Sequence, residues 1–140
     1  MKRILPFLLS AILLTVCLSG CAHSRQIGDL SRTSYIEVRA FSMTERRYTD
    51  YVISDVETVD GICAAFAELS LERIKNTEPL MTAYELQFYN HSHAPVDSIT
   101  VLTDGTMLKY DGQLYSINAD IKAYIDAIVA TLEPVNIEES

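Results

Sequence analysis

The dipeptide Asp111-Gly112 constrains the fold more tightly than any other short stretch of this chain. It stands between two runs with strand-like composition, 106–110 and 113–117. Asp-Gly favours a two-residue turn in which both central residues have positive φ, and such a turn pairs its flanking strands antiparallel. The sequence therefore predicts a tight hairpin here. A strand expected over 96–102 extends the hairpin into a meander.

Three further segments alternate in polarity as half-buried strands do. In the first of them Ile36 and Val38 alternate with Glu37 and Arg39. One face of each strand should therefore meet a core, and the other should meet solvent. These predicted strands cover residues 34–41, 48–53 and 82–90.

Two segments carry apolar residues at three- and four-residue steps, which is the spacing of a helix with one buried face. Ser54 followed by Glu57 fits a capping box for a helix over 55–70. Asn118 is a candidate cap for a second helix, over 119–132. Residues 71–79 are expected to lead away from the first helix into a turn.

The predicted element order is β-β-α-β-β-β-β-α within one domain, residues 34–133. One apolar stripe on each helix and alternating strands favour an α+β two-layer sandwich, with an antiparallel sheet and both helices on one of its faces. The other face of the sheet is then expected to be polar and aromatic. An acidic tail, residues 134–140, follows.

The N-terminus has the three zones of a secretory signal peptide. Lys2 and Arg3 precede an apolar stretch, and small residues close it before Cys21. The uninterrupted apolar part is shorter than the roughly 20 residues of a membrane-spanning helix, and Pro6 weakens that alternative further.

The residues Leu18-Ser19-Gly20-Cys21 resemble the lipobox of bacterial lipoprotein precursors. In that family a diacylglyceryl group is attached to the cysteine sulfur, and a peptidase then cuts before the cysteine. The resemblance implies that residues 1–20 are removed, that Cys21 is lipidated, and that residues 21–33 form a flexible tether spanning roughly 20 Å. A plain signal peptide and an uncleaved helix are the alternatives.

A lipid on Cys21 implies an extracytoplasmic protein held on the outer side of a bacterial cytoplasmic membrane. The residue after the cysteine is Ala22 rather than aspartate, so transfer to an outer membrane would be allowed in a Gram-negative cell. The body resembles, in layout rather than in motif, the short bacterial lipoproteins that pair such a signal with one compact domain. That resemblance implies no activity.

Charge excludes one class of partner. The chain carries 11 Lys and Arg against 19 Asp and Glu, and Lys2 and Arg3 would leave with the signal peptide. So acidic a domain is a poor match for nucleic acid, whose binding needs clustered cations. An acidic domain is also repelled by an anionic lipid surface, so the lipid on Cys21, and not surface charge, is expected to hold the protein at a membrane.

The uncovered sheet face supplies the candidate interaction site. Aromatic and charged residues share that face in two predicted strands, an arrangement found in protein-binding surfaces. The leading hypothesis is a binding module for an envelope protein or component, and no cofactor is expected. Cross-strand stabilisation of the sheet, or a purely structural or inhibitory role, is the alternative. The candidate residues are Tyr35, Glu37, Arg39 and Tyr89.

Two other features are candidates for a chemical role: a pair of histidines and one cysteine. His91 and His93 are weak candidates for metal binding, with Asp97 nearby in sequence, because a zinc or copper site needs a third ligand. They motivate the alternative of a metal-dependent or hydrolytic envelope enzyme. Cys63 falls on the apolar stripe of the first helix and is expected to pack as a small apolar residue.

Overall fold

The computed structural model describes residues 24–75 and 80–135. These residues form one antiparallel sheet of seven strands and two helices. The elements in chain order are β1 Tyr35–Ser42, β2 Arg47–Ile53, α2 Val56–Ala67, β3 Leu71–Arg73, β4 Thr82–Tyr89, β5 Pro95–Leu102, β6 Met107–Tyr110, β7 Gln113–Ile117 and α3 Ile121–Val129. The expected signal peptide, Cys21, the turn at 76–79 and most of the acidic tail lie outside the described residues.

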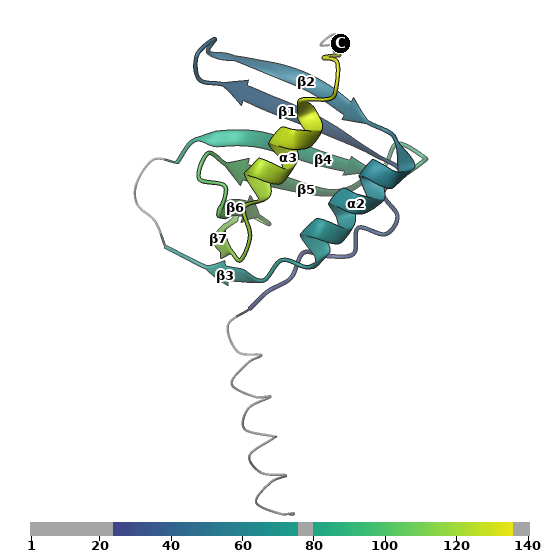
Figure 1. Cartoon of the computed structure of the whole chain (residues 1–140). Helices are drawn as coiled ribbons and strands as arrows, with labels where there is room; N and C mark the ends of the chain where they lie inside the picture. Colours follow the sequence, from purple (N-terminus) through teal and green to yellow (C-terminus); the bar gives the residue numbers. More distant parts are fainter. Residues whose placement is uncertain (1–23, 76–79, 136–140) are drawn as a thin grey trace, which may run out of the picture.

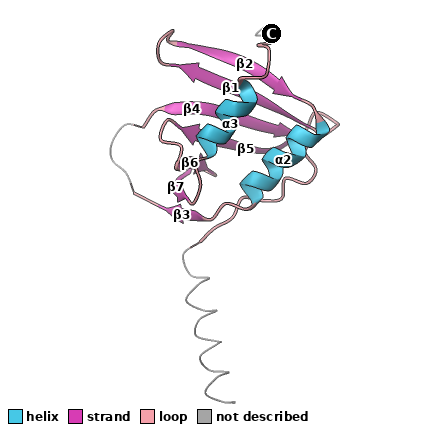
Figure 2. Ribbon diagram, viewed as in Figure 1, coloured by secondary structure: helices cyan, strands magenta, loops and turns pink. Residues whose placement is uncertain are grey.

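The strands are ordered β2-β1-β4-β5-β6-β7-β3 across the sheet, and every pair is antiparallel. Both helices lie on one face of this sheet, as Figures 1 and 2 show. The predicted α+β architecture is therefore confirmed. None of the helices among the described residues is long and apolar enough to cross a bilayer.

The core lies between the helices and the face of the sheet beneath them. Alternation directs Ile36 of β1 and Phe88 of β4 into this layer, and each is fully buried. Phe66 of α2 meets Phe88 edge to face, with ring centroids 5.9 Å apart. Because the opposite residues of the same strands remain partly exposed, the sheet has one packed face and one open face.

The Asp111-Gly112 turn forms as predicted. Asp111 has φ 52° and Gly112 has φ 73°, the positive values that a two-residue turn of this type requires. Tyr110 and Gln113 are directly paired on either side of the turn. The turn thereby fixes the register of β6 against β7.

The helix starts differ from the sequence prediction by one or two residues. The cap of α2 is Asp55 rather than Ser54, and its carboxylate accepts a hydrogen bond from the Thr58 backbone N–H at 3.0 Å. Asp120, not Asn118, caps α3. A carboxylate is as good a cap as a hydroxyl or an amide, and it also complements the positive end of the helix.

The strand β3 was not predicted. Leu71 is fully buried and pairs with Ile117 of β7, so residues 71–73 extend the sheet instead of leading away from it. Three residues are too few to show alternation, and their partner lies more than 40 positions later in the chain. The prediction for this segment was wrong because the pairing is entirely non-local.

Residues 24–33, expected to be part of a flexible tether, pack against the body instead; we call them the strap. Ile27 is 7% exposed and Leu30 is 4% exposed, so both belong to the core. Arg25 and Leu71 exchange two backbone hydrogen bonds of 2.8 Å at the outer edge of β3. Burial of each apolar side chain contributes about 1.5–3 kcal/mol toward holding the strap in place.

Candidate functional site

The open face of β1 and β4 carries all four residues of the predicted interaction site. They occupy the odd-numbered positions of both strands, opposite in direction to the buried Ile36, Val38 and Phe88. The strand register brings them side by side rather than scattering them along the sheet. The directly opposed pairs are Tyr35 with Tyr89, Glu37 with Gln87, and Arg39 with Glu85.

One end of this face is aromatic. The rings of Tyr35 and Tyr89 stack with centroids 5.0 Å apart and an interplanar angle of 11°. The His93 ring meets Tyr35 edge-on at 5.5 Å, and its Nδ1 lies 2.8 Å from the Tyr35 hydroxyl. The three rings, from β1, the end of β4 and the turn that follows it, therefore form an aromatic wall that presents π faces and polar groups.

The other end is ionic. The Arg39 guanidinium donates to Asp50 of β2, with Nε 2.9 Å from Oδ1. It also lies over the Tyr48 ring, 5.6 Å from the centroid. Asp50 is the less exposed partner, with 17% of its side chain accessible against 42% for Arg39. This pair fixes the position of Arg39 and offsets its charge locally.

Between these two ends lies a groove of about 410 Å³. Three carboxylates and one guanidinium line it, so it is negative overall even with Arg39 charged. Burial, and then the charge of Glu37, raise the pKa of the Tyr89 hydroxyl, which hydrogen-bonds to that carboxylate. The lining residues are Glu37, Val38, Arg39, Asp50, Glu85, Gln87 and Tyr89.

The histidine pair is not brought together with a third ligand. His91 is exposed in the turn between β4 and β5, and His93 contacts Tyr35. Asp97 is directed to the helix-covered side, where it accepts a hydrogen bond of 2.7 Å from the Tyr110 hydroxyl. Among residues 24–75 and 80–135 no group of three His, Cys, Asp or Glu is close enough to hold a metal ion.

Cys63 packs against the core from α2, as predicted, and is half-buried. Burial is the main cause that raises the pKa of its thiol. A raised pKa keeps the sulfur protonated near neutral pH, whereas a reactive cysteine needs the thiolate. Cys63 therefore has the environment of a packing residue.

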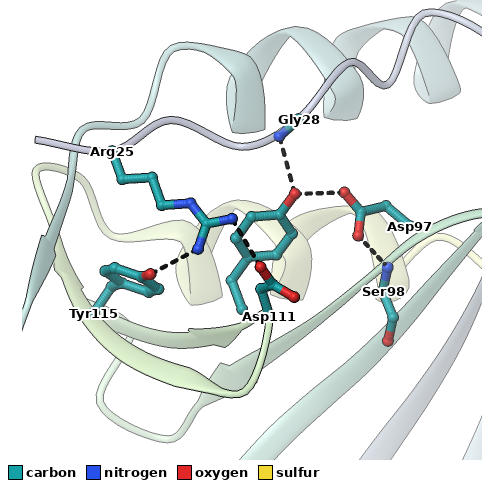
Figure 3. Close-up of polar contacts among 7 residues, drawn as sticks. Arg25, Gly28, Asp97, Ser98, Asp111 and Tyr115 are labelled. Carbon is teal, nitrogen blue, oxygen red and sulfur yellow. Dashed lines mark hydrogen bonds and ion pairs between the residues drawn. The ribbon is translucent and has the colours of Figure 1, made fainter.

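A second polar cluster, which the sequence did not predict, joins the strap to the sheet (Figure 3). The Arg25 guanidinium lies over the rings of Tyr110 and Tyr115, 5.0 Å and 5.9 Å from their centroids. It donates to the Tyr115 hydroxyl and to the Asp111 carboxylate, each at 2.9 Å. Those two hydrogen bonds raise the pKa of Arg25, so it stays charged.

The Tyr110 hydroxyl is the centre of the same cluster. It accepts from the Gly28 backbone N–H at 3.0 Å and donates to Asp97. A Cβ added at Gly28 would lie 3.1 Å from this hydroxyl, so a side chain there would require the Tyr110 hydroxyl to shift by a few tenths of an ångström. One signal could have indicated the cluster: buried tyrosines need partners for their hydroxyls, and Tyr110 and Tyr115 flank a predicted turn.

Comparisons with protein-family models, with curated proteins and with solved structures gave no match to this chain.

Proposed function

We propose that this protein is a lipid-anchored binding module of a bacterial envelope. The lipobox-like residues Leu18-Ser19-Gly20-Cys21 support an anchor outside the cytoplasm. The observation that carries the binding role is the open-face groove, in which an aromatic wall adjoins a cluster of charged groups. Anchor and groove belong to different parts of the chain, so one holds the protein in place while the other is available for recognition.

The groove favours a partner that presents cationic side chains. Its carboxylates outnumber its guanidinium, and Glu37 and Glu85 lie on neighbouring strands. The stacked tyrosines add surfaces on which an ammonium or guanidinium group binds through cation–π attraction, worth about 0.5–1 kcal/mol at an exposed site. A lysine- or arginine-bearing segment of another envelope protein fits this chemistry.

The anchor is tested by Cys21→Ala in the full-length precursor, with Cys17→Ala as the matched control. Lipidation requires the Cys21 sulfur, so the first variant is expected to remain unprocessed and to carry no lipid. Cys17→Ala should be processed as the wild type is. Membrane fractionation, precursor size on a gel and the mass of the mature N-terminus report the result. Normal processing of Cys21→Ala would rule out the lipoprotein assignment.

The binding surface is tested by photo-crosslinking in the cell of origin. A benzoyl-phenylalanine at Gln87 lies in the groove, whereas one at Val56, which is 70% exposed at the start of α2, lies on the opposite side of the sheet. We expect a discrete crosslinked product from position 87 and none from position 56. Glu37→Gln combined with Glu85→Gln should remove that product. Equal products from both positions would refute the assignment of the open face.

A further inference from the structure

The strap determines where the chain leaves the folded body. Ser24 lines a surface hollow of about 350 Å³ together with Leu71 and Ile117, and Arg25 pairs with Leu71. The described chain therefore begins beside β3, at one edge of the sheet, as the purple segment in Figure 1 shows. Anything attached shortly before Ser24 must also be close to this edge.

The distance from this exit to Cys21 is short. Four residue spacings separate Cys21 from Arg25, and an extended chain spans at most about 14 Å over that number. A tether running to residue 33 would have allowed a mean span of roughly 20 Å and a much longer maximum reach. Because the strap is packed, that slack is absent from residues 25–33.

The groove lies far from the exit. Figure 1 shows β3 and β2 at opposite edges of the sheet, and the order is β2-β1-β4-β5-β6-β7-β3. At about 4.8 Å between neighbouring strands, β4 is roughly 19 Å and β1 roughly 24 Å from β3. Both distances exceed the reach of the residues between Cys21 and Arg25.

Two independent sets of contacts keep the strap in place. Ile27 and Leu30 are buried in the core, so releasing them exposes apolar surface. Arg25 and Gly28 are bound to side chains of β6, β7 and the turn between them. The point where the described chain begins is thus fixed to the folded body beside β3.

We propose that the edge of the body formed by β3 and the β6–β7 hairpin faces the lipid bilayer, and that the groove between β1 and β4 is presented away from it. This inference rests on the proposed lipidation of Cys21. The partner of this edge is the lipid surface itself, brought close by the covalent anchor and not by charge. The groove is then accessible to partners that approach from the envelope.

The experiment uses the full chain, lipidated in a bacterial host and inserted into phosphatidylcholine nanodiscs that carry a gadolinium-chelating lipid. Amide relaxation measured by NMR reports the proximity of each strand to the bilayer. We expect relaxation enhancement at Glu72 and Arg73 of β3 to exceed that at Thr49 and Tyr51 of β2 by at least about tenfold, because about 29 Å of sheet separates the two edges.

The matched control is a 12-residue Gly/Ser insertion between Ala22 and His23, which leaves the strap unchanged. It should reduce the enhancement at β3 and make it similar across the sheet. Mass spectrometry on the same sample reports the lipid on Cys21. A lipidated protein with uniform enhancement, or an insertion without effect, would overturn the orientation alone. A protein without lipid on Cys21 would overturn both the orientation and the proposed anchor.

Discussion

Strands β1 and β4 present different surfaces on their two faces. One face forms part of the core, and the other is the surface that we propose for recognition. On the covered face Ile36, Leu86 and Phe88 are fully buried beneath the helices. On the open face the neighbouring residues are polar, charged or aromatic and only partly exposed, and several of them line a groove. A change on the first face is therefore expected to alter folding, and a change on the second to alter binding.

The largest expected effect comes from adjacent residues of β4 that face opposite ways. Phe88→Ala removes a fully buried ring that packs on Phe66, and it should lower the free energy of unfolding by about 4 kcal/mol. Gln87→Ala, on the open face, should change it by less than about 0.5 kcal/mol. Urea denaturation followed by circular dichroism measures both. Similar losses from the two variants would contradict the distinction between the faces.

The strap belongs to the covered side of the sheet, where Ile27 and Leu30 are part of the core. Leu30→Ala should lower the free energy of unfolding by about 3 kcal/mol, because Leu30 is 4% exposed and its removal leaves a cavity. Gln26→Ala, at an exposed position four residues earlier, serves as the control and should have little effect. If Leu30→Ala proved as stable as the wild type, residues 24–33 would be a tether after all.

The contact between the sheet and α3 includes a titratable carboxylate, Asp126, which accepts a hydrogen bond from the Tyr84 hydroxyl. Burial acts to raise the pKa of Asp126, but hydrogen bonds from Lys122 and Tyr84 outweigh it and lower that pKa. Because the pKa of Asp126 is lower in the folded state, its carboxylate stabilises the fold at pH values above the unfolded-state pKa of about 3.9. This contribution is lost as the pH falls through the folded-state pKa.

Asp126→Asn should therefore be less stable than the wild type at pH 7, with a difference that narrows as the pH falls below about 4. Denaturation curves at pH 7 and at acid pH test this expectation. Because Asp126 remains partly exposed, the whole effect is expected to be modest. A difference that stayed constant with pH would mean that Asp126 does not titrate in this contact.

The smallest expected effect on stability is on the open face. Glu37→Gln combined with Glu85→Gln should leave the free energy of unfolding within about 0.5 kcal/mol of the wild type, because neither carboxylate is buried. Thermal unfolding is sufficient to measure it. A large loss would show that the two glutamates hold the sheet together, which is the alternative role for this face.

Local sequence patterns predicted the main strands and the turn, whereas the parts of the structure that depend on non-local contacts were not predicted. Alternation over 34–41 and 82–90 and the Asp111-Gly112 turn are signals between near neighbours, and they predicted the main strands and the shared face of Tyr35 and Tyr89. The contacts of Arg25 with Tyr110 and Tyr115 join residues more than 80 positions apart. Two apolar residues in the strap gave no periodicity that would mark it as packed.

The groove also depends on non-local pairing between strands. The sequence placed Glu37 and Arg39 on one face, but Asp50 and Glu85 joined them only through the register of β2 and β4 against β1. Register depends on the turns and on the core beneath the sheet, and a shift of one residue would exchange the two faces. The composition of each strand face was therefore predictable, whereas the groove was not.

The proposed recognition of a cationic segment by the open face can be measured by an NMR titration. The chain lacking residues 1–20 and carrying Cys21→Ala is titrated with tetralysine at low ionic strength, and amide shifts are followed. We expect shifts concentrated at Glu37, Arg39, Glu85 and Gln87. These shifts should be lost in Glu37→Gln/Glu85→Gln and retained in the α2-side control Glu57→Gln/Glu68→Gln. Shifts spread evenly over the acidic surface, or unchanged in the first variant, would contradict this proposal.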